Sequence, residues 1–142
     1  AIKGGATVVQ LRMKDAGGNE MLRVAKELVP VCRAAGIPLI INDRIDVAVA
    51  ADADGAHVGQ SDMPAADARK VLGYNKILGV SCKTVELALK AQRDGADYVG
   101  CGAVWGTNTK DTTVVGLEGL GQVAKSTTVP VVAIGGVNDS NA

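Results

Sequence analysis

The stretch Val8-Val9-Gln10-Leu11-Arg12-Met13-Lys14-Asp15 begins with apolar residues and ends with charged ones. Successive side chains of a β-strand point to opposite faces of the sheet. If the extended conformation persists, Gln10, Arg12 and Lys14 therefore project to one side, and the residues between them to the other. Two cations and an amide in one row suit a phosphorylated ligand. The alternative is a strand that runs out into a solvated loop, and the rest of the chain decides between the two.

The same design, an apolar run followed by polar residues, recurs along the chain. Strands are expected at residues 7–12, 38–41, 55–59, 76–80, 97–101 and 129–134. Helices are expected between them, at residues 20–35, 45–51, 64–72, 84–93 and 117–126. In the first helix, Asn19 is the expected cap, Pro30 is a candidate for a kink and Gly36 is the expected terminator.

Alternating strands and helices predict right-handed crossovers and a parallel sheet. A (β/α)8 TIM barrel and an open doubly wound sheet both fit this pattern. Two features favour the barrel. Glycine-alanine pairs precede three of the strands, at Gly5-Ala6, Gly55-Ala56 and Gly95-Ala96, and a barrel gathers all the polar strand ends at one mouth. Because six strands do not close a barrel of eight, we expect residues 1–142 to form one partial TIM-barrel domain, with one strand-helix unit missing on each side.

The composition argues against several classes of function. Fifteen Lys and Arg balance fifteen Asp and Glu, so there is no basic footprint for nucleic acid. No apolar run approaches the roughly 20 residues of a membrane span, and no signal peptide is visible. The three cysteines lack the spacing of metal ligands, which indicates free thiols in a reducing compartment. We therefore expect a cytoplasmic location.

In a parallel α/β fold the ligand lies at the carboxyl ends of the strands. The residues expected there are Gln10, Arg12, Lys14, Asn42, Asp43, Gln60, Asp62, Ser81, Lys83, Thr107, Thr109, Lys110, Gly135 and Gly136. This set combines cations, carboxylates, hydroxyls and a glycine turn, but it contains no activated nucleophile beside a base. The chemistry that it suits is the handling of a diphosphate.

The cations of this set, Arg12, Lys14 and Lys110, can neutralise phosphate oxygens. Asp43 and Asp62 can hold Mg²⁺, which prefers a few carboxylates together with substrate phosphates. The alternative for each aspartate is that it caps the helix that follows it.

A second, smaller phosphate would suit Thr107, Thr109 and the backbone N–H groups at Gly135-Gly136. The alternative for the two threonines is that they are ordinary loop hydroxyls. The only histidine, His57, lies within an expected strand, and a core or wall position is favoured over a catalytic role.

These residues, in this order, resemble the thiamine phosphate synthase (thiamine-phosphate pyrophosphorylase) family over nearly the whole chain. The motifs that carry the resemblance are Val9-Gln10-Leu11-Arg12-Met13-Lys14, Ile41-Asn42-Asp43-Arg44, residues 57–64, Gly79-Val80-Ser81, residues 95–100, Thr107-Asn108-Thr109-Lys110 and residues 130–136. The combination is specific, although no single motif would be.

The resemblance implies a (β/α)8 barrel transferase. It would join 4-amino-2-methyl-5-(diphosphomethyl)pyrimidine to 4-methyl-5-(2-phosphoethyl)thiazole with the help of Mg²⁺, giving thiamine phosphate and diphosphate. Diphosphate would leave first, and the thiazole nitrogen would attack the resulting pyrimidine cation. By this resemblance the pyrimidine diphosphate is bound by Gln10, Arg12, Lys14, Asn42, Ser81 and Lys110, of which Arg12, Lys14, Ser81 and Lys110 are catalytic. Asp43 and Asp62 would hold the metal, and Thr107, Thr109 and Gly136 would bind the thiazole phosphate.

Two departures from the family pattern are visible. Met13 stands where glutamate is usual, and Cys82-Lys83 replaces a small residue and a histidine.

Two other functions stay open: a thiazole tautomerase-like relative, which has no diphosphate to bind, and a non-catalytic phosphate-binding or regulatory barrel fragment. The expected partners are the two small phosphorylated substrates, without nucleic acid or membrane. A homo-oligomer and a fusion to a hydroxyethylthiazole kinase are also open.

Overall fold

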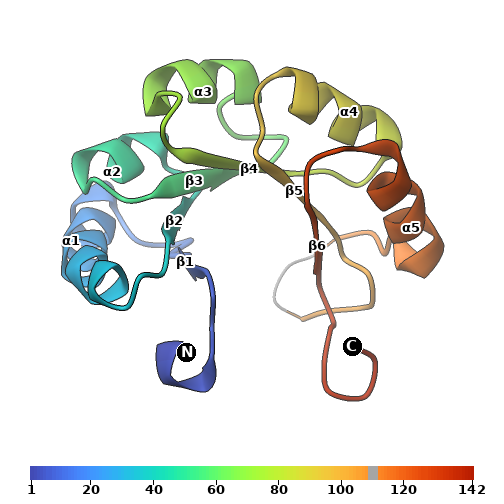
Figure 1. Cartoon of the computed structure of the whole chain (residues 1–142), viewed down its shortest axis with the longest axis horizontal. Helices are drawn as coiled ribbons and strands as arrows, with labels where there is room; N and C mark the ends of the chain where they lie inside the picture. The colour runs from blue at the N-terminus through green and yellow to red at the C-terminus, as the bar shows by residue number, and fades with distance from the viewer. Residues whose placement is uncertain (109–111) are drawn as a thin grey trace. The chain divides into compact units, whose positions relative to one another are not determined.

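Strands and helices alternate through the whole chain in a computed structural model, which describes residues 1–108 and 112–142. Figure 1 labels the elements. They are a 3-10 helix at Ile2–Gly4, β1 Val9–Leu11, α1 Gly18–Ala34, β2 Leu39–Asn42, α2 Ile45–Ala50, β3 Gly55–Val58, α3 Ala65–Leu72, β4 Ile77–Ser81, α4 Val85–Arg93, β5 Tyr98–Gly102, α5 Gly116–Ser126 and β6 Val131–Ile134. This order confirms every strand and helix that the sequence predicts.

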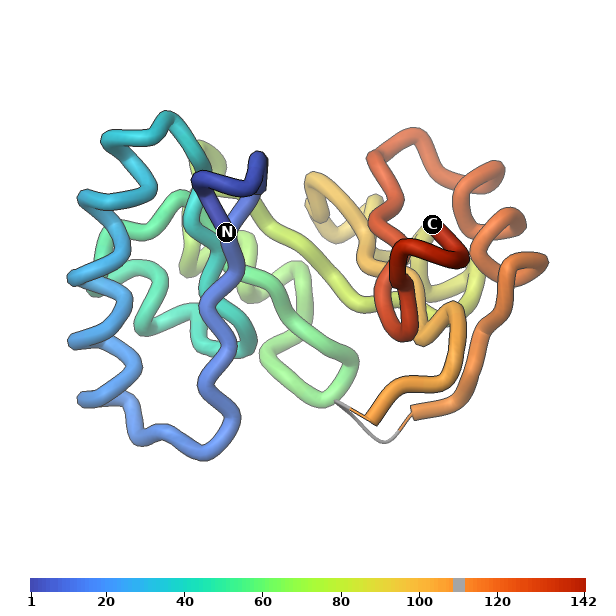
Figure 2. Tube along the Cα trace, turned by 90° about the horizontal axis from the view of Figure 1, so that it is seen from below, coloured from blue at the N-terminus to red at the C-terminus, as the bar shows by residue number. Residues whose placement is uncertain are grey.

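The chain divides within β4 into two compact units, Ala1–Leu78 and Gly79–Ala142. In the first unit, β1 pairs with β2 and β2 pairs with β3, all in parallel. Three consecutive residues of β2, Leu39–Ile41, are wholly buried, as expected for a parallel strand that is covered on both faces. Figure 2 shows the chain running along β1, turning through residues 12–17 and returning along α1.

In the second unit, β5 pairs in parallel with β4 on one side and with β6 on the other. Helices α4 and α5 follow β4 and β5 along the chain and lie on one side of these strands (Figure 1). After β6 the chain folds back on itself, where Asn141 and Ala142 donate backbone hydrogen bonds to the carbonyl of Asn138 (Figure 2). Within the described parts of the chain, no helix is long and apolar enough to cross a membrane.

The start of α1 corrects one prediction. The capping position is Gly17, with extended backbone and no side-chain cap, and Asn19 lies inside the first turn. The reason is that the N–H of Met21 already donates to the carbonyl of Gly17 at 3.1 Å, so helical bonding begins two residues before Asn19. The predicted terminator is confirmed, because Gly36 has a left-handed φ of 68° just after the helix. Pro30 lies inside the helix, which continues to Ala34.

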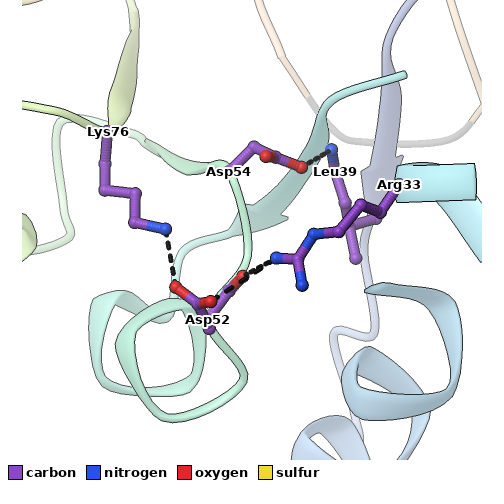
Figure 3. A network of polar contacts seen from close by, with 5 residues as sticks. All are labelled: Arg33, Leu39, Asp52, Asp54 and Lys76. Carbon is purple, nitrogen blue, oxygen red and sulfur yellow. Dashed lines mark hydrogen bonds and ion pairs between the residues drawn. The ribbon is translucent and has the colours of Figure 1, made fainter. Parts of the chain in front are cut away.

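Four charged side chains gather at the amino ends of β2, β3 and β4 in the first unit (Figure 3), and we call them the amino-edge network: Arg33, Asp52, Asp54 and Lys76. Lys76 Nζ lies 2.7 Å from Asp52 Oδ1, and Arg33 lies 3.4 Å from Asp52 Oδ2. Lys76, and to a lesser extent Arg33, lowers the pKa of Asp52 below its usual value. Asp54 Oδ2 accepts a 2.8 Å hydrogen bond from the N–H of buried Leu39. The network ties α1 and the three strand starts together.

Candidate phosphate and cation sites

Three charged side chains from successive strand ends meet in the first unit. We call Lys14, Asp43 and Asp62 the carboxyl-edge cluster; they follow β1, β2 and β3 respectively. Lys14 Nζ lies 3.6 Å from Asp43 Oδ2, with the two side chains 51% and 27% exposed. The predicted convergence of the first three strand ends is therefore present within this unit.

Asp43 has an unusual backbone. Its φ is 66°, and the N–H of Arg44 donates to the carbonyl of Asn42 at 2.8 Å, which closes a three-residue γ-turn around Asp43. The N–H of Asp43 donates to the backbone carbonyl of His57, also at 2.8 Å. The residue at the capping position of α2 is Arg44, and no side chain makes a capping bond there. Asp43 is thus not a helix cap, and a strained non-glycine turn of this kind is typical of functional sites.

Asp62 is not a helix cap either. Its Oδ2 accepts a 2.7 Å hydrogen bond from the N–H of Gly59 at the end of β3. The capping position of α3 is Pro64, where there is no side-chain cap bond. The carboxylate is therefore held by the strand end that precedes it and not by the helix that follows.

Asp43 is close enough to Asp62 to affect the ionisation of the Asp62 carboxyl group. Burial raises the pKa of Asp62 most, and hydrogen bonding and negative charge from Asp43 raise it further. The N–H of Gly59 and the charge of Lys14 oppose this increase. One lysine thus faces two carboxylates, and a second cation would relieve their repulsion.

The carboxylates of the carboxyl-edge cluster, Asp43 and Asp62, suit one mode of binding Mg²⁺. Among the described residues there is no group of three or more His, Cys, Asp or Glu side chains that could hold a metal. Mg²⁺ does not need such a cage, because it is usually bound by one or two carboxylates, water and substrate phosphates. The pair Asp43 and Asp62 fits this mode, and the charge of a phosphorylated ligand would complete it.

A small hollow opens beside the cluster, and four of its lining residues, Met13, Ala16, Met21 and Arg44, are not among those assigned to the site from the sequence. It has a volume of about 120 Å³ and is lined by Met13, Lys14, Ala16, Met21, Asn42, Asp43 and Arg44. Arg44 is fixed there by two hydrogen bonds to Asp46, at 2.8 and 2.6 Å. A Cβ atom on Gly18 would come within 2.8 Å of the Arg44 guanidinium, so the glycine makes room for it. The position of Arg44 directly after Asp43 was the available sequence signal.

The remaining predicted residues of this unit lie along the same strand ends. Gln10, Arg12 and Lys14 are exposed, while Leu11 and Met13 are half-buried, which confirms the predicted alternation. Asn42 is the last residue of β2 and lies in register with His57. His57 is only 4% exposed, which confirms its interpretation as a core residue.

The second unit brings two of its predicted residues into one region. Gly136, with a φ of 72°, packs so closely that a Cβ atom there would lie 2.7 Å from Trp105 Cβ and 2.8 Å from the carbonyl of Gly106. Thr107 follows Gly106 directly, so the glycine turn after β6 lies against the segment that carries this threonine. Ser81 is the last residue of β4, in register with Gly100. Thr109 and Lys110 lie outside the described residues.

Parallel strands alternating with helices define a protein of the (β/α)8-barrel class. The family described as "Thiamine monophosphate synthase" matches residues 1–142. The chain belongs to this family.

Individual relatives agree with the family match. The chain is 56% identical over 143 residues to the "Thiamine biosynthetic bifunctional enzyme TH1, chloroplastic" of Arabidopsis thaliana, covering 100% of this chain and 27% of that protein. It is 54% identical over 144 residues to the "Thiamine-phosphate synthase" of Chloroflexus aurantiacus, covering 100% of this chain and 66% of that protein. The chain thus spans about a quarter of the first relative and about two thirds of the second.

Solved structures support the fold. The "Thiamine phosphate pyrophosphorylase" from Pyrococcus furiosus superposes with a TM-score of 0.89 and 42% identity, covering 98% of this chain and 67% of that one. The N-acetylmannosamine-6-phosphate 2-epimerase from Clostridium perfringens, at 16% identity and a TM-score of 0.63, shares the fold alone. The predicted fold class, a TIM-barrel fragment with about six strand-helix units, is confirmed.

Proposed function

We propose that the protein containing this chain is a thiamine phosphate synthase. It would transfer the pyrimidine-methyl group of 4-amino-2-methyl-5-(diphosphomethyl)pyrimidine to the nitrogen of 4-methyl-5-(2-phosphoethyl)thiazole. The observation that carries the proposal is the carboxyl-edge cluster, in which the neighbouring carboxylates Asp43 and Asp62 both face Lys14. Membership of the family and the match to the Chloroflexus enzyme support it.

The first unit is assigned to the pyrimidine diphosphate. Arg12 and Lys14 would neutralise its phosphate oxygens, and Gln10 and Asn42 would hydrogen-bond to the substrate. The strand-end positions of these four side chains and the exposure of the row from Gln10 to Lys14 support this assignment. By the family resemblance Ser81 and Lys110, which belong to the second unit, are also assigned to this substrate.

Asp43 and Asp62 are assigned to Mg²⁺. When bound, the metal would neutralise negative charge that builds up on the departing diphosphate. Lys14, which is paired with Asp43 in this structure, would then have the diphosphate as a competing anion. The closeness of two carboxylates to a single lysine supports this assignment.

The second unit is assigned to the thiazole phosphate. Thr107 and Thr109 would donate hydroxyl hydrogen bonds, and Gly136 would offer its backbone N–H. The close approach of Gly136 to Trp105 and Gly106 supports the assignment, because it places this glycine turn against the segment that carries Thr107.

The reaction needs little covalent chemistry from the protein. The bond between the pyrimidine methylene carbon and the diphosphate oxygen breaks, and both bonding electrons leave with the diphosphate. The thiazole nitrogen then donates its lone pair to the carbon, which gives the thiazolium product. Arg12, Lys14 and Lys110 would stabilise the leaving group by charge, and fixing both substrates in one orientation would contribute much of the remaining acceleration. The absence of a nucleophile-base pair from the predicted set agrees with this mechanism.

The test is product formation by the full protein as its gene encodes it. Incubation with both substrates and Mg²⁺ should yield thiamine phosphate and diphosphate in equal amounts, measured by chromatography. Binding of both substrates without product would support the regulatory alternative instead. Isomerisation of a thiazole carboxylate phosphate, without use of the pyrimidine diphosphate, would support the tautomerase alternative.

Two further proposals concern the whole protein. A cytoplasmic location is supported by three buried free cysteines, which suit a reducing compartment. The second proposal is a fusion to a hydroxyethylthiazole kinase. It is supported by the Arabidopsis and rice relatives, which are described as chloroplastic and bifunctional. Imaging of a fluorescently tagged full protein tests the location, and the sequence of its gene tests the fusion.

A further inference from the structure

Two asparagines that follow β6 hold the backbone carbonyl of Gly136, and the proposed function assigns no role to either of them. Asn141 Nδ2 donates to this carbonyl at 3.0 Å, and Asn138 Nδ2 donates to it at 3.3 Å. All three residues belong to the second unit. The two side chains therefore act directly on the glycine to which a phosphate is assigned.

The side-chain amide of Asn141 makes a hydrogen bond at each end. Its Nδ2 donates to Gly136, and its Oδ1 accepts from the N–H of Asn138 at 2.8 Å. In return, Asn138 Oδ1 accepts from the N–H of Ser140 at 2.9 Å, which gives the reciprocal pattern of a capping box. The N–H groups of Asn141 and Ala142 close the turn on the carbonyl of Asn138. Asn141 is thus fixed in place before it reaches Gly136.

The opposite side of the glycine turn is held by the start of the connection after β5. The N–H groups of Val104 and Trp105 donate to the carbonyls of Ile134 and Gly135, at 2.9 and 3.0 Å. Together with the carbonyl of Gly136, three successive carbonyls of the turn are therefore bonded. The N–H of Gly136 has no hydrogen-bond acceptor among the described residues. An N–H left open in such a turn suits the oxygen of an anion.

The planarity of the peptide bond explains how Asn141 can orient this N–H. The N–H of Gly136 shares a peptide plane with the carbonyl of Gly135, which Trp105 holds, and the carbonyl of Gly136 lies in the next plane, which Asn141 holds. Both planes that meet at Gly136 are thereby fixed. Glycine has little conformational preference of its own, so the loss of one anchor would allow the turn to reorient.

We propose that Asn141 is a positioning residue for the thiazole phosphate. It would hold Gly136 in the conformation that presents its N–H to a phosphate oxygen, and it would not touch the substrate itself. The inference rests on the proposed function, which assigns the phosphate to Gly136. Asn138 would support the same carbonyl through its longer bond.

The experiment measures ligand binding to the full protein by calorimetry. The probes are 4-methyl-5-(2-phosphoethyl)thiazole and the corresponding alcohol, which lacks the phosphate. Asn141→Leu removes both hydrogen bonds with little change in size, so Kd for the phosphate should rise about tenfold while Kd for the alcohol stays unchanged. Asn141→Gln keeps a donor and an acceptor at a position where capping boxes accept glutamine, and it should restore most of the affinity.

Asn75→Leu is the matched control. It makes the same chemical change at an exposed asparagine that precedes β4 in the first unit, and it should leave both Kd values unchanged. Unchanged affinity for the phosphate in Asn141→Leu would overturn the proposal. An equal loss for the phosphate and the alcohol, together with a lower melting temperature, would show a merely structural role and would overturn it as well.

A second pair of variants keeps the test decisive if Asn141→Leu does not fold. Asn141→Asp retains the acceptor for the N–H of Asn138 and loses only the 3.0 Å donor to Gly136. Asn138→Asp introduces the same charge, retains the acceptor for Ser140 and loses only the 3.3 Å donor. Asn141→Asp should weaken phosphate binding more than Asn138→Asp. Equal effects would mean that the added charge and not the lost donor is responsible, which would refute the inference.

Binding also separates this inference from the proposed function. If the wild type binds the thiazole phosphate but makes no thiamine phosphate, the proposed function fails, and the Kd values of the Asn141 variants still decide the positioning role. If the wild type makes thiamine phosphate and Asn141→Leu binds the thiazole phosphate normally, the inference alone fails. A wild type that does not bind the thiazole phosphate would overturn the inference directly.

Discussion

The two edges of the sheet in the first unit hold aspartates in opposite electrostatic settings. At the amino edge, Asp52 is shared by Lys76 and Arg33, and its pKa is lowered. At the carboxyl edge, Asp43 shares a single lysine with Asp62, and the pKa of Asp62 is raised. The first arrangement is satisfied by the protein alone. The second is not, and we propose that this difference distinguishes a structural ion-pair network from a ligand site.

Backbone conformation makes the comparison unusually well matched. Asp43 and Asp52 are the two non-glycine residues with positive φ in the described parts of the chain, at 66° and 53°. Asparagine tolerates this conformation about as well as aspartate. Substitution of either residue by asparagine therefore changes charge while largely preserving the backbone, and the two edges can be tested with the same chemical change.

The largest expected effect is that of Asp43→Asn on activity. Removing this charge should lower kcat by roughly 10²–10³-fold, the scale of losing one preorganised electrostatic group. The measurement is steady-state formation of thiamine phosphate at saturating substrates. Asp52→Asn is the control and should keep nearly full activity. Equal losses in both variants would mean that the two edges do not differ in function.

The next effect is on folding, at the amino edge. Asp54→Ala should lower the free energy of unfolding by about 1–3 kcal/mol, because the N–H of buried Leu39 loses its acceptor. Urea denaturation followed by circular dichroism measures the loss. Asp54→Asn keeps an acceptor oxygen and should lose clearly less. If both variants are as stable as the wild type, the amino-edge network has no structural importance.

A smaller effect of opposite sign is expected at the carboxyl edge. Asp62→Asn should raise the free energy of unfolding at pH 7, by less than about 1 kcal/mol, because it removes one of two neighbouring carboxylates and retains an acceptor for the N–H of Gly59. The raised pKa of Asp62 means that its protonated form is favoured in the folded state. Its contribution to stability is therefore present at low pH and lost as pH rises through the raised pKa.

The gain from Asp62→Asn should accordingly shrink as pH falls through the raised pKa of Asp62, and it should be gone below the ordinary aspartate value. Denaturation at a series of pH values tests this sign. A variant less stable than the wild type at pH 7 would show that the carboxylate pair is not repulsive.

The smallest effect is that of Asp52→Asn on stability. The lowered pKa of Asp52 means that its ionised form stabilises the fold, and that this contribution is lost as pH falls through the lowered pKa. The variant should melt slightly below the wild type at pH 7 and no differently in strong acid. Because the pair is exposed, the difference should also vanish at about 1 M salt, where the Debye length is about 3 Å. A difference that persists at high salt would contradict this account.

The fold was predictable from the sequence because its signals are local and periodic. Apolar runs such as Leu39–Ile41 and the polar residues after them mark the strands and their ends without reference to tertiary structure. The row of Gln10, Arg12 and Lys14 follows from strand geometry in the same way. The error at Asn19 arose because capping preference is a weak local signal, and the flexible pair Gly17-Gly18 allowed the helix to start earlier.

Other features of the site depend on contacts between distant residues. At the γ-turn around Asp43, the N–H of Asp43 donates to the carbonyl of His57 on the neighbouring strand, and the sequence alone does not predict this bond. The hollow beside Met13 and Arg44 is lined by residues from two segments that are separate in the sequence, within residues 13–21 and 42–44. The hydrogen bonds from Lys83 to Thr112 and Thr113 span 29 and 30 residues. Only a three-dimensional structure brings such pairs together.

The central claim is that Asp43 and Asp62 hold a divalent cation for a diphosphate ligand. Calorimetric titration of inorganic diphosphate, with and without Mg²⁺, tests it in the wild type and in the Asp43→Asn, Asp62→Asn and Asp52→Asn variants. We predict that Mg²⁺ strengthens diphosphate binding to the wild type and to Asp52→Asn, but not to the two carboxyl-edge variants. The same enhancement by Mg²⁺ in all four proteins would contradict the claim.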